Sequence, residues 1–289
     1  MSQVLNTNLM SLIAQRNLSA SQMSLSTSMQ RLSSGLRINS SADDAAGLSI
    51  ASRMNSQVQG MAIAGRNAND AISLSQTADG AMGSVTNLLQ TMRQLAVQSA
   101  NGTNTSADRK NLDQEFQQLA QEATRTLGGT QFNGQNILAS TAAQTFQIGA
   151  NATTDMDQIS IAGYSWATDT SVTAVLGSAV ITGTATAAMG IGGTDGTSAT
   201  AAITAIDDAI TAVNTQRATY GATQNRFNNV ISNLQTAGVN QSAAYSRIMD
   251  ADYASETANL SRSQILQQAG NAMVAQANQM PQQILALLK

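Results

Sequence analysis

The sequence contains no cysteine and no histidine. The absence of cysteine excludes disulfides, thiol nucleophiles and thiolate metal ligands. The absence of histidine removes the commonest general base and metal ligand, which excludes an HExxH metalloprotease and a Ser-His-Asp hydrolase. We therefore predict a protein that is not an enzyme, with no catalytic residues, no metal site and no cofactor.

Charged and aromatic residues are also scarce, at 11% and 3% of the 289 residues, and the only proline is Pro281. Soluble domains usually contain about 25% charged residues, and their cores rely on aromatic side chains. A chain of small, polar and aliphatic residues instead favours long helices with narrow apolar seams. The net charge of −3 argues against nucleic acid as a partner.

Long apolar runs are missing as well. No stretch reaches the roughly 18 consecutive apolar residues of a transmembrane helix, so no membrane partner is expected. The opening "MSQVLNTNLMSLIAQRN" lacks the basic and apolar regions of a secretory signal peptide. Residues 263–288 carry no charged side chain, yet they are too polar for a membrane anchor. The sequence alone therefore indicates a cytoplasmic protein, unless another export route is used.

Heptad spacing dominates both ends of the chain. One seam keeps a strict four-three alternation, and similar seams run through residues 18–36, 112–123, 203–234 and 266–287. Such long repeats are typical of coiled-coil packing, with ordinary helix-bundle packing as the alternative. The simplest arrangement pairs the N-terminal and C-terminal blocks with each other. The strict seam consists of Leu74, Ala78, Ala81, Val85, Leu88, Met92 and Leu95.

The middle of the chain reads differently, because residues 126–216 contain no lysine or arginine. The stretches "QFNGQNIL", "QTFQIGAN" and "DMDQISIAG" alternate around turn residues, which predicts short strands and hairpins. The low-complexity stretch "TGTATAAMGIGGTDGTSAT" predicts an exposed turn or irregular loop. The predicted fold is mostly α, with long coiled-coil-like helices and a small β-hairpin-rich insert, an α+β arrangement.

Helix ends are also visible in the sequence. Gly35 is expected to end the first helix, and Ser41 to cap the next one with Asp43 and Asp44 in its first turn. The two carboxylates could instead bind a metal or act in catalysis, but no third ligand type lies nearby.

Several long motifs closely resemble bacterial flagellin, the subunit of the flagellar filament. They include "RLSSGLRINSSADDAAGLSIASRM" at residues 31–54 and "LAVQSANGTNT" at 95–105. At the other end, "GATQNRFNNVISNLQ" and the stretch from "SRIMDADYASETANLSRSQILQQAG" to residue 288 match as well. The resemblance covers about residues 1–140 and 200–289. It implies a structural protein that polymerises into an extracellular helical filament used for motility.

The resemblance also implies a division into domains. Residues 1–40 and 248–289 would form a discontinuous inner-tube helical domain that lines the export channel. Residues 41–149 and 202–247 would form an outer-tube domain with β-hairpins, and 150–201 a short insert that faces solvent. Neutral polar side chains suit a channel wall, and such helices are expected to order only on assembly.

The implied partners are other copies of the chain, the flagellar cap and hook-associated proteins, and an export chaperone at the C-terminal helix. Export would use the flagellar type III apparatus without a cleaved signal peptide. A hook–filament junction protein, which shares the terminal motifs, is the alternative function. The predicted inter-subunit assembly seam consists of Leu5, Leu9, Leu12, Leu25, Met29, Leu32, Leu266, Met273, Ala277, Met280, Ile284 and Leu287.

Two sets of residues match flagellin surfaces that host immune receptors recognise. Plant receptors bind a peptide that corresponds to residues 30–51, where the candidates are Gln30, Arg31, Leu32, Gly35, Arg37, Asn39, Asp43, Asp44, Gly47 and Leu48. Ser41 and Ala42 replace the usual Ala and Lys there. For an animal Toll-like receptor the matching residues are Gln90, Arg93, Leu95 and Glu115. Thr91 replaces an arginine and Gln94 a glutamate, which predicts weakened activation.

Overall fold

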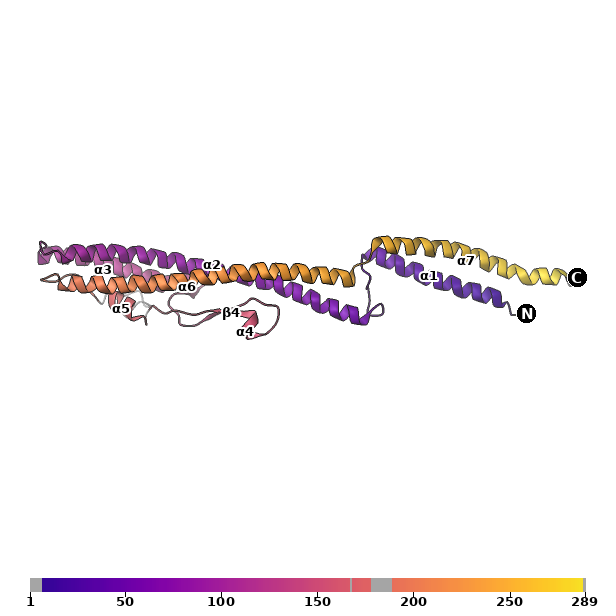
Figure 1. The fold of residues 1–289 in the computed structure, drawn as a ribbon, viewed down its shortest axis with the longest axis horizontal. Coiled ribbons are helices and arrows are strands. Elements are labelled where there is room, and N and C mark those ends of the chain that lie inside the picture. Colours follow the sequence, from indigo (N-terminus) through magenta and orange to yellow (C-terminus); the bar gives the residue numbers. More distant parts are fainter. Residues whose placement is uncertain (1–6, 167, 178–188, 288–289) are drawn as a thin grey trace. The chain divides into compact units, whose positions relative to one another are not determined.

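The computed structural model describes residues 7–166, 168–177 and 189–287 (Figure 1). The chain forms two compact units: unit 1 comprises Met1–Val58 and Val239–Lys289, and unit 2 comprises Gln59–Gly238. Long helices dominate both units, and two small antiparallel sheets lie in unit 2. The predicted fold class is therefore confirmed.

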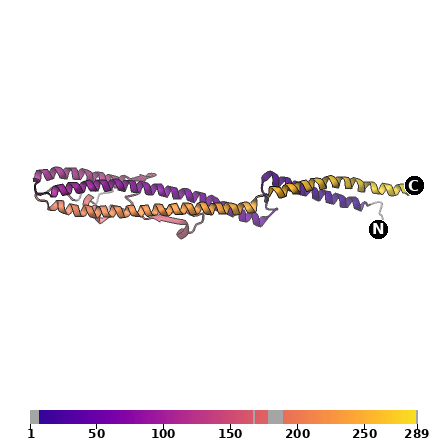
Figure 2. The ribbon, with the colours of Figure 1, turned by 45° about the horizontal axis from the view of Figure 1, so that its top comes forward.

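Unit 1 is built around α1 (Leu9–Ser34) and α7 (Tyr253–Leu287). The two helices run side by side in opposite directions, as Figures 1 and 2 show. The Asn8 side-chain amide donates to the Ala277 carbonyl at 2.7 Å, and the Ser24 and Ser263 hydroxyl oxygens lie 3.2 Å apart. The predicted pairing of the N-terminal and C-terminal blocks is therefore confirmed.

The helix ends agree only in part with those predicted from the sequence. Gly35 ends α1 with a φ of 72°, a left-handed conformation that glycine adopts without a Cβ penalty. The next helix, α2 (Ala45–Ala100), starts later than expected, so Ser41 is not its cap. Asp44 caps it instead, because its carboxylate accepts the Gly47 amide at 2.8 Å. Asp43 instead accepts the Asn39 and Ser40 amides of the preceding turn, so the two carboxylates bind different amides.

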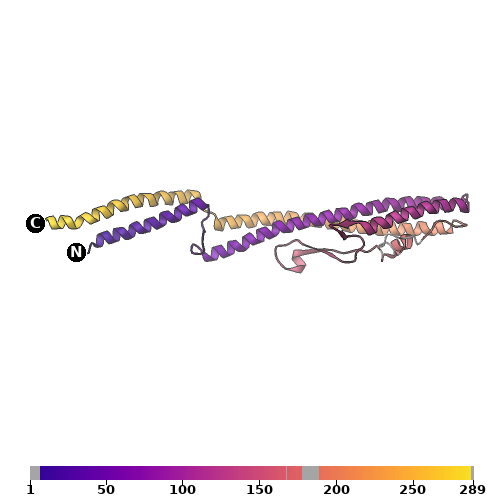
Figure 3. The same cartoon turned by 180° about the vertical axis from the view of Figure 1, so that it is seen from behind.

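Unit 2 is a bundle of α2, α3 (Ser106–Gly129) and α6 (Thr197–Met249), seen from behind in Figure 3. The strict heptad seam of α2 faces the core: Leu74, Ala78, Val85 and Met92 are at most 5% exposed. Aromatic side chains are few, and four of them, Phe116, Trp166, Tyr220 and Phe227, are buried in this cluster. A capping box between Thr105 and Asp108 begins α3.

The predicted hairpins are present. Strands β1 (Gln131–Phe132) and β2 (Gln135–Asn136) pair around Asn133 and Gly134, which both have positive φ, as a type I′ turn requires. Strands β3 (Gln144–Gln147) and β4 (Gln158–Ile161) pair antiparallel, with the short helix α4 (Thr154–Asp157) between them. The Phe146 ring meets Phe227 of α6 edge-on at 5.8 Å, which fastens this sheet to the bundle. Helix α5 (Thr170–Leu176) follows β4.

The low-complexity stretch before α6 is not simply an exposed loop. Residues 178–188 lie outside the described part of the chain, and α6 already begins at Thr197. Between them the backbone is irregular, as predicted, but Ile191 is completely buried in the unit 2 core. A single isoleucine among glycines left no periodic signal, which is why the sequence pattern did not indicate its burial.

Candidate functional site

The interface between α1 and α7 is made mostly of small and polar side chains. On α1 the buried and half-buried positions follow strict heptad spacing, but three of them are serines. On α7 the inward positions include Glu256, Ser263, Gln267 and Gly270. This set, called here the α1·α7 seam, consists on α1 of Ser11, Ala14, Leu18, Ser21, Leu25, Ser28 and Leu32, and on α7 of Glu256, Leu260, Ser263, Gln267, Gly270, Val274 and Ala277.

Most of the large apolar side chains of these two helices point the other way. Leu9 is 64% exposed and Met273 is 62% exposed, although both belong to helices that are otherwise closely paired. Exposed large apolar side chains in this number on two paired helices indicate an interaction site. These outward apolar residues are Leu9, Met10, Leu12, Ile13, Met23 and Met29 on α1, and Ile265, Leu266, Met273 and Met280 on α7.

The predicted assembly seam is therefore distributed over both surfaces. Leu25, Leu32 and Ala277 lie in the α1·α7 seam. Six members are outward apolar residues: Leu9, Leu12, Met29, Leu266, Met273 and Met280. Leu5 and the side chains of Ile284 and Leu287 lie outside the described residues. A seam predicted from apolar residues alone leaves out the serines that complete the heptads.

The junction between the helices of unit 1 is held by main-chain contacts. Leu36 and Asp250 form an antiparallel bridge, and the Ala251 amide donates to the Gly35 carbonyl at 2.9 Å. The Arg37 guanidinium donates through Nε and Nη2 to the Ile248 carbonyl. The segment after α1 and the segment before α7 are thus hydrogen-bonded to each other.

Several of the candidate plant-receptor residues lie in this junction and are already engaged within the chain. The Asp43 carboxylate accepts hydrogen bonds from Ser40 and Asn39, and the Ser40 amide is the main cause of its lowered pKa. Gly47 is buried, and a Cβ there would lie 2.3 Å from an oxygen of Asp44. The ten candidates all lie within residues 30–48, but they are divided between α1, the junction and the start of α2.

The candidate Toll-like receptor residues lie in unit 2, and they differ in accessibility. Gln90 on α2 and Glu115 on α3 are exposed, whereas Leu95 is buried against the core. The Arg93 guanidinium binds both carboxylate oxygens of Asp207 on α6, at 2.6 and 3.1 Å. This hydrogen bonding raises the pKa of Arg93 and lowers the pKa of Asp207. The replacement residues Thr91 and Gln94 are both exposed.

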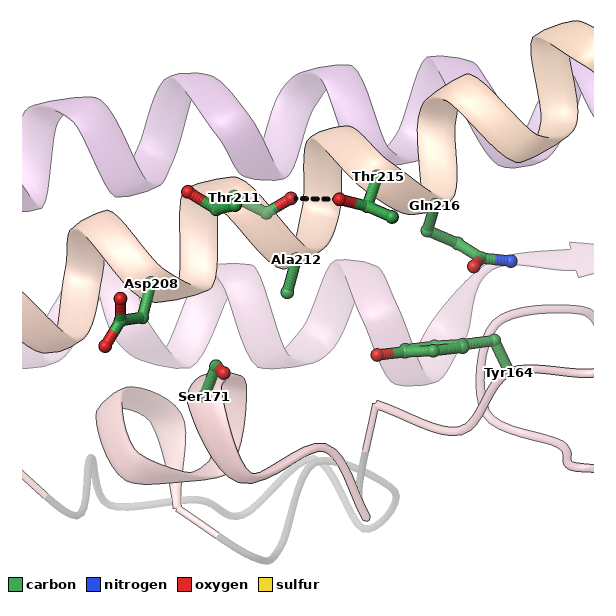
Figure 4. A pocket seen from close by; sticks show the side chains of 7 residues that line it. All are labelled: Tyr164, Ser171, Asp208, Thr211, Ala212, Thr215 and Gln216. Carbon is green, nitrogen blue, oxygen red and sulfur yellow. Dashed lines mark hydrogen bonds between the residues drawn. The ribbon is translucent and has the colours of Figure 1, made fainter.

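An open hollow of about 300 Å³ lies between α5 and α6 (Figure 4). Among the described residues, mostly hydroxyl and amide groups line it, and Asp208 supplies the one carboxylate. Burial raises the pKa of Tyr164 to about 12, so its phenol stays protonated at neutral pH and cannot serve as a base. The hollow therefore lacks the pair of acid and base groups that hydrolytic chemistry uses.

No group of three or more His, Cys, Asp or Glu side chains is placed to hold a metal ion in the described ranges. Within the same ranges, no helix is long and apolar enough to cross a membrane. The candidate functional site is thus the surface of α1 and α7, not a pocket.

Comparison with known families gives two matches that together span most of the chain. The bacterial flagellin N-terminal helical region matches residues 5–143, and the bacterial flagellin C-terminal helical region matches residues 203–288. The residues between these matches contain the second hairpin, α5 and the segment before α6.

Individual relatives agree over their full lengths. A flagellin of Halalkalibacterium halodurans is 44% identical over 99% of this chain and 100% of its own. A flagellin of Serratia marcescens is 40% identical over 100% of both chains, and flagellin B of Vibrio cholerae is 35% identical over 98% of both. A crystal structure of Bacillus cereus flagellin, 33% identical, covers 62% of this chain and 94% of its own with a TM-score of 0.47.

Proposed function

This chain belongs to the bacterial flagellins, the structural subunits of the extracellular flagellar filament, and we propose that its outward apolar residues are the surface through which subunits join. The observation that carries this proposal is the exposure of most large apolar side chains on α1 and α7. Nine of the fourteen seam residues are small or polar, while ten large apolar side chains lie exposed outside the seam. Neighbouring copies of the same helices would bury them.

The energetics favour folding that is coupled to assembly. Burying one large apolar side chain contributes roughly 1.5–3 kcal/mol, so most of the apolar burial available to α1 and α7 is realised only between subunits. Their seam holds five large apolar side chains, and the hydrogen bonds across it each add only about 0.5–1.5 kcal/mol in net terms. The two helices are then marginal in the free subunit and become ordered in the filament. An interface that repeats head to tail without closing generates a helical polymer.

A double substitution tests the assembly surface. Replacing Leu266 and Met273 with serine should raise the critical concentration for polymerisation at least tenfold, because two exposed apolar side chains lose their buried partners. Met156→Ser is the matched control, since Met156 is 82% exposed but lies in α4 of unit 2. Unchanged polymerisation of the double variant would contradict the proposal. Long filaments from the unmodified protein, rather than short rings, would exclude the hook–filament junction alternative.

We further propose the domain roles that the family resemblance implies. Residues 1–40 and 248–289 form the inner tube, 41–149 and 202–247 form the outer tube, and 150–201 face solvent. The uncharged stretch 263–288 lines the channel, where neutral side chains solvate a passing chain without holding it electrostatically. A helical reconstruction of the filament that places charged residues of unit 2 along the channel would contradict this assignment.

The proposed partners follow from the same surface. A chaperone covers the outward apolar residues of α7 before export through the flagellar type III apparatus, without cleavage of a signal peptide. The cap and hook-associated proteins contact the two ends of the filament. A chaperone that binds the Leu266 and Met273 double serine variant as tightly as the unmodified chain would contradict the first of these roles.

We also propose that the two receptor-matching segments act as immune epitopes with different accessibility. The plant epitope at residues 30–51 would be recognised as a peptide, because Asp43, Arg37 and Gly47 are engaged in the folded junction. A synthetic peptide that fails to stimulate responsive plant cells would exclude this.

The Toll-like receptor contact would be weak. Thr91 and Gln94 stand where an arginine and a glutamate are expected, and the Arg93 guanidinium is already bound by Asp207. A reporter assay in which this protein matches the potency of a flagellin that retains the arginine would refute the prediction.

A further inference from the structure

One helix face in unit 2 binds the main chain, rather than the side chains, of the segment that leads into α6. Arg109, Asp113 and Gln117 follow one another at four-residue spacing on α3, so they lie on the same face of the helix. Their partners are main-chain groups of residues 189–194. We propose that these three side chains form a main-chain clasp that fixes the position at which α6 begins.

Arg109 supplies one end of the clasp. Although charged, it is only 4% exposed, and its guanidinium donates three hydrogen bonds to carbonyl oxygens. Two of them go to Ser99 and Asn101 at the end of α2, at 2.9 and 3.1 Å, and the third goes to Thr194 at 3.0 Å. One buried side chain therefore joins the end of α2, the start of α3 and the segment before α6. The first two bonds satisfy carbonyls that lack helical partners.

Asp113 supplies the centre of the clasp. Its carboxylate accepts the Ile191 amide at 2.7 Å, and the buried Ser99 hydroxyl donates to the Ile191 carbonyl at 2.7 Å. The Ile191 side chain is fully buried in the unit 2 core. Gln117 adds a longer contact of 3.4 Å to the Met189 carbonyl. All three groups of Ile191, its amide, carbonyl and side chain, are thus held.

The glycines of the segment explain why this close approach is possible. A Cβ at Gly190 would lie 3.1 Å from a carboxylate oxygen of Asp113, and one at Gly192 would lie 3.1 Å from the Asp113 Cβ. A Cβ at Gly196 would lie 2.8 Å from the Ala100 carbonyl oxygen. Each residue type in the stretch "GIGG" therefore has a structural reason. The glycines leave room for the Asp113 carboxylate, and the isoleucine side chain packs into the core.

The clasp determines the register of α6. The last clasp bond is at Thr194 and α6 begins at Thr197, so little free chain separates them. Fixing that start places Asp207 opposite Arg93 and Arg217 opposite Asp79, the two ion pairs that join α6 to α2. Because the clasp contacts main-chain atoms, the exposed side chain of Thr194 is free to vary without loss of the register.

Hydrogen exchange at the Ile191 amide tests the clasp in the full chain, with the core amide of Val85 as the internal reference. In the unmodified protein both amides should be protected. Asp113→Leu removes the acceptor and should speed Ile191 exchange by about tenfold or more while Val85 stays protected. Asp113→Asn keeps an acceptor oxygen and should fall between the two. Thr194→Ala, which retains its carbonyl, should change Ile191 exchange by less than about twofold.

Three outcomes would overturn the clasp. The Ile191 amide could exchange as in an unstructured peptide in the unmodified chain. Asp113→Leu could leave Ile191 exchange unchanged. Both Asp113 variants could accelerate Ile191 and Val85 equally, which would mean that the segment is held only by the folding of the whole unit.

Discussion

Unit 1 and unit 2 use the same heptad spacing with different side chains. In unit 2 the spacing positions Leu74, Val85 and Met92 in a core that also buries the aromatic rings. In the α1·α7 seam of unit 1 it positions four leucines and a valine among serines, a glycine and a glutamate, while ten large apolar side chains lie exposed outside the seam. The repeat therefore specifies that two helices pair, whereas the residue types decide whether the pair is stable alone or needs neighbouring subunits.

The largest expected effect comes from a core residue of unit 2. Phe116 is fully buried, so Phe116→Ala should lower the free energy of unfolding of the free subunit by about 3–5 kcal/mol. Leu25→Ala in the α1·α7 seam should change it by less than about 1 kcal/mol, because that seam adds little before assembly. Urea unfolding of both variants checks the comparison. Similar losses in the two variants would show that α1 and α7 are as stable in the free subunit as the core of unit 2.

A second substitution targets the seam of unit 1 in the assembled state. Gly270 lies against Leu18, where an added Cβ would be 3.1 Å from the Leu18 Cδ1. Gly270→Leu should therefore overpack the seam by about 1–3 kcal/mol and raise the critical concentration for polymerisation by about fivefold to a hundredfold. The urea unfolding of unit 2 should stay unchanged.

The matched control for Gly270→Leu is Gly80→Ala on α2. A Cβ there meets no atom within 4 Å, so polymerisation should proceed as in the unmodified protein. If Gly270→Leu assembles normally, the close contact with Leu18 is not maintained in the filament. The assembly of unit 1 would then depend less on its seam than proposed.

Sequence patterns predicted these two regions with unequal success, and the reasons are physical. The seam from Leu74 to Leu95 and the Asn133–Gly134 hairpin follow from local periodicity and turn geometry. The serines of the α1·α7 seam were missed because a buried serine has no hydropathy signal. The clasp of Asp113 on Ile191 joins residues 78 positions apart, so no local pattern could reveal it. Asp44 takes the place of Ser41 as the cap because its carboxylate accepts the Gly47 amide in the first turn of α2.

A smaller effect is expected at the junction of unit 1. Gly35 has a φ of 72°, so Gly35→Ala places a Cβ in the left-handed region and should cost about 1–2 kcal/mol. Because α1 is proposed to order only in the filament, the loss should appear as a lower depolymerisation temperature rather than as weaker unfolding of unit 2. Gly65→Ala, in the helical part of unit 2 with no atom within 4 Å of the new Cβ, is the control. Equal depolymerisation temperatures for Gly35→Ala and the unmodified filament would contradict the prediction.

The smallest effect concerns the ion pair between Arg93 and Asp207, which belongs to unit 2 but is solvent-exposed like the surface of unit 1. The hydrogen bond from Arg93 lowers the pKa of Asp207 in the folded state. A lowered carboxyl pKa adds stability above the unfolded value of about 4, and that stability is lost as the pH falls through the folded pKa. Both side chains are about half exposed, so solvent screening keeps the contribution small.

Urea unfolding at pH 6 and at pH 3 checks this expectation. Between these two pH values, the free energy of unfolding should fall slightly less for Asp207→Asn than for the unmodified chain. Asp208→Asn, one residue further along α6, should leave the loss unchanged. If Asp207→Asn and Asp208→Asn behave alike, the pair adds nothing measurable, and the stability of unit 2 rests on its apolar core alone.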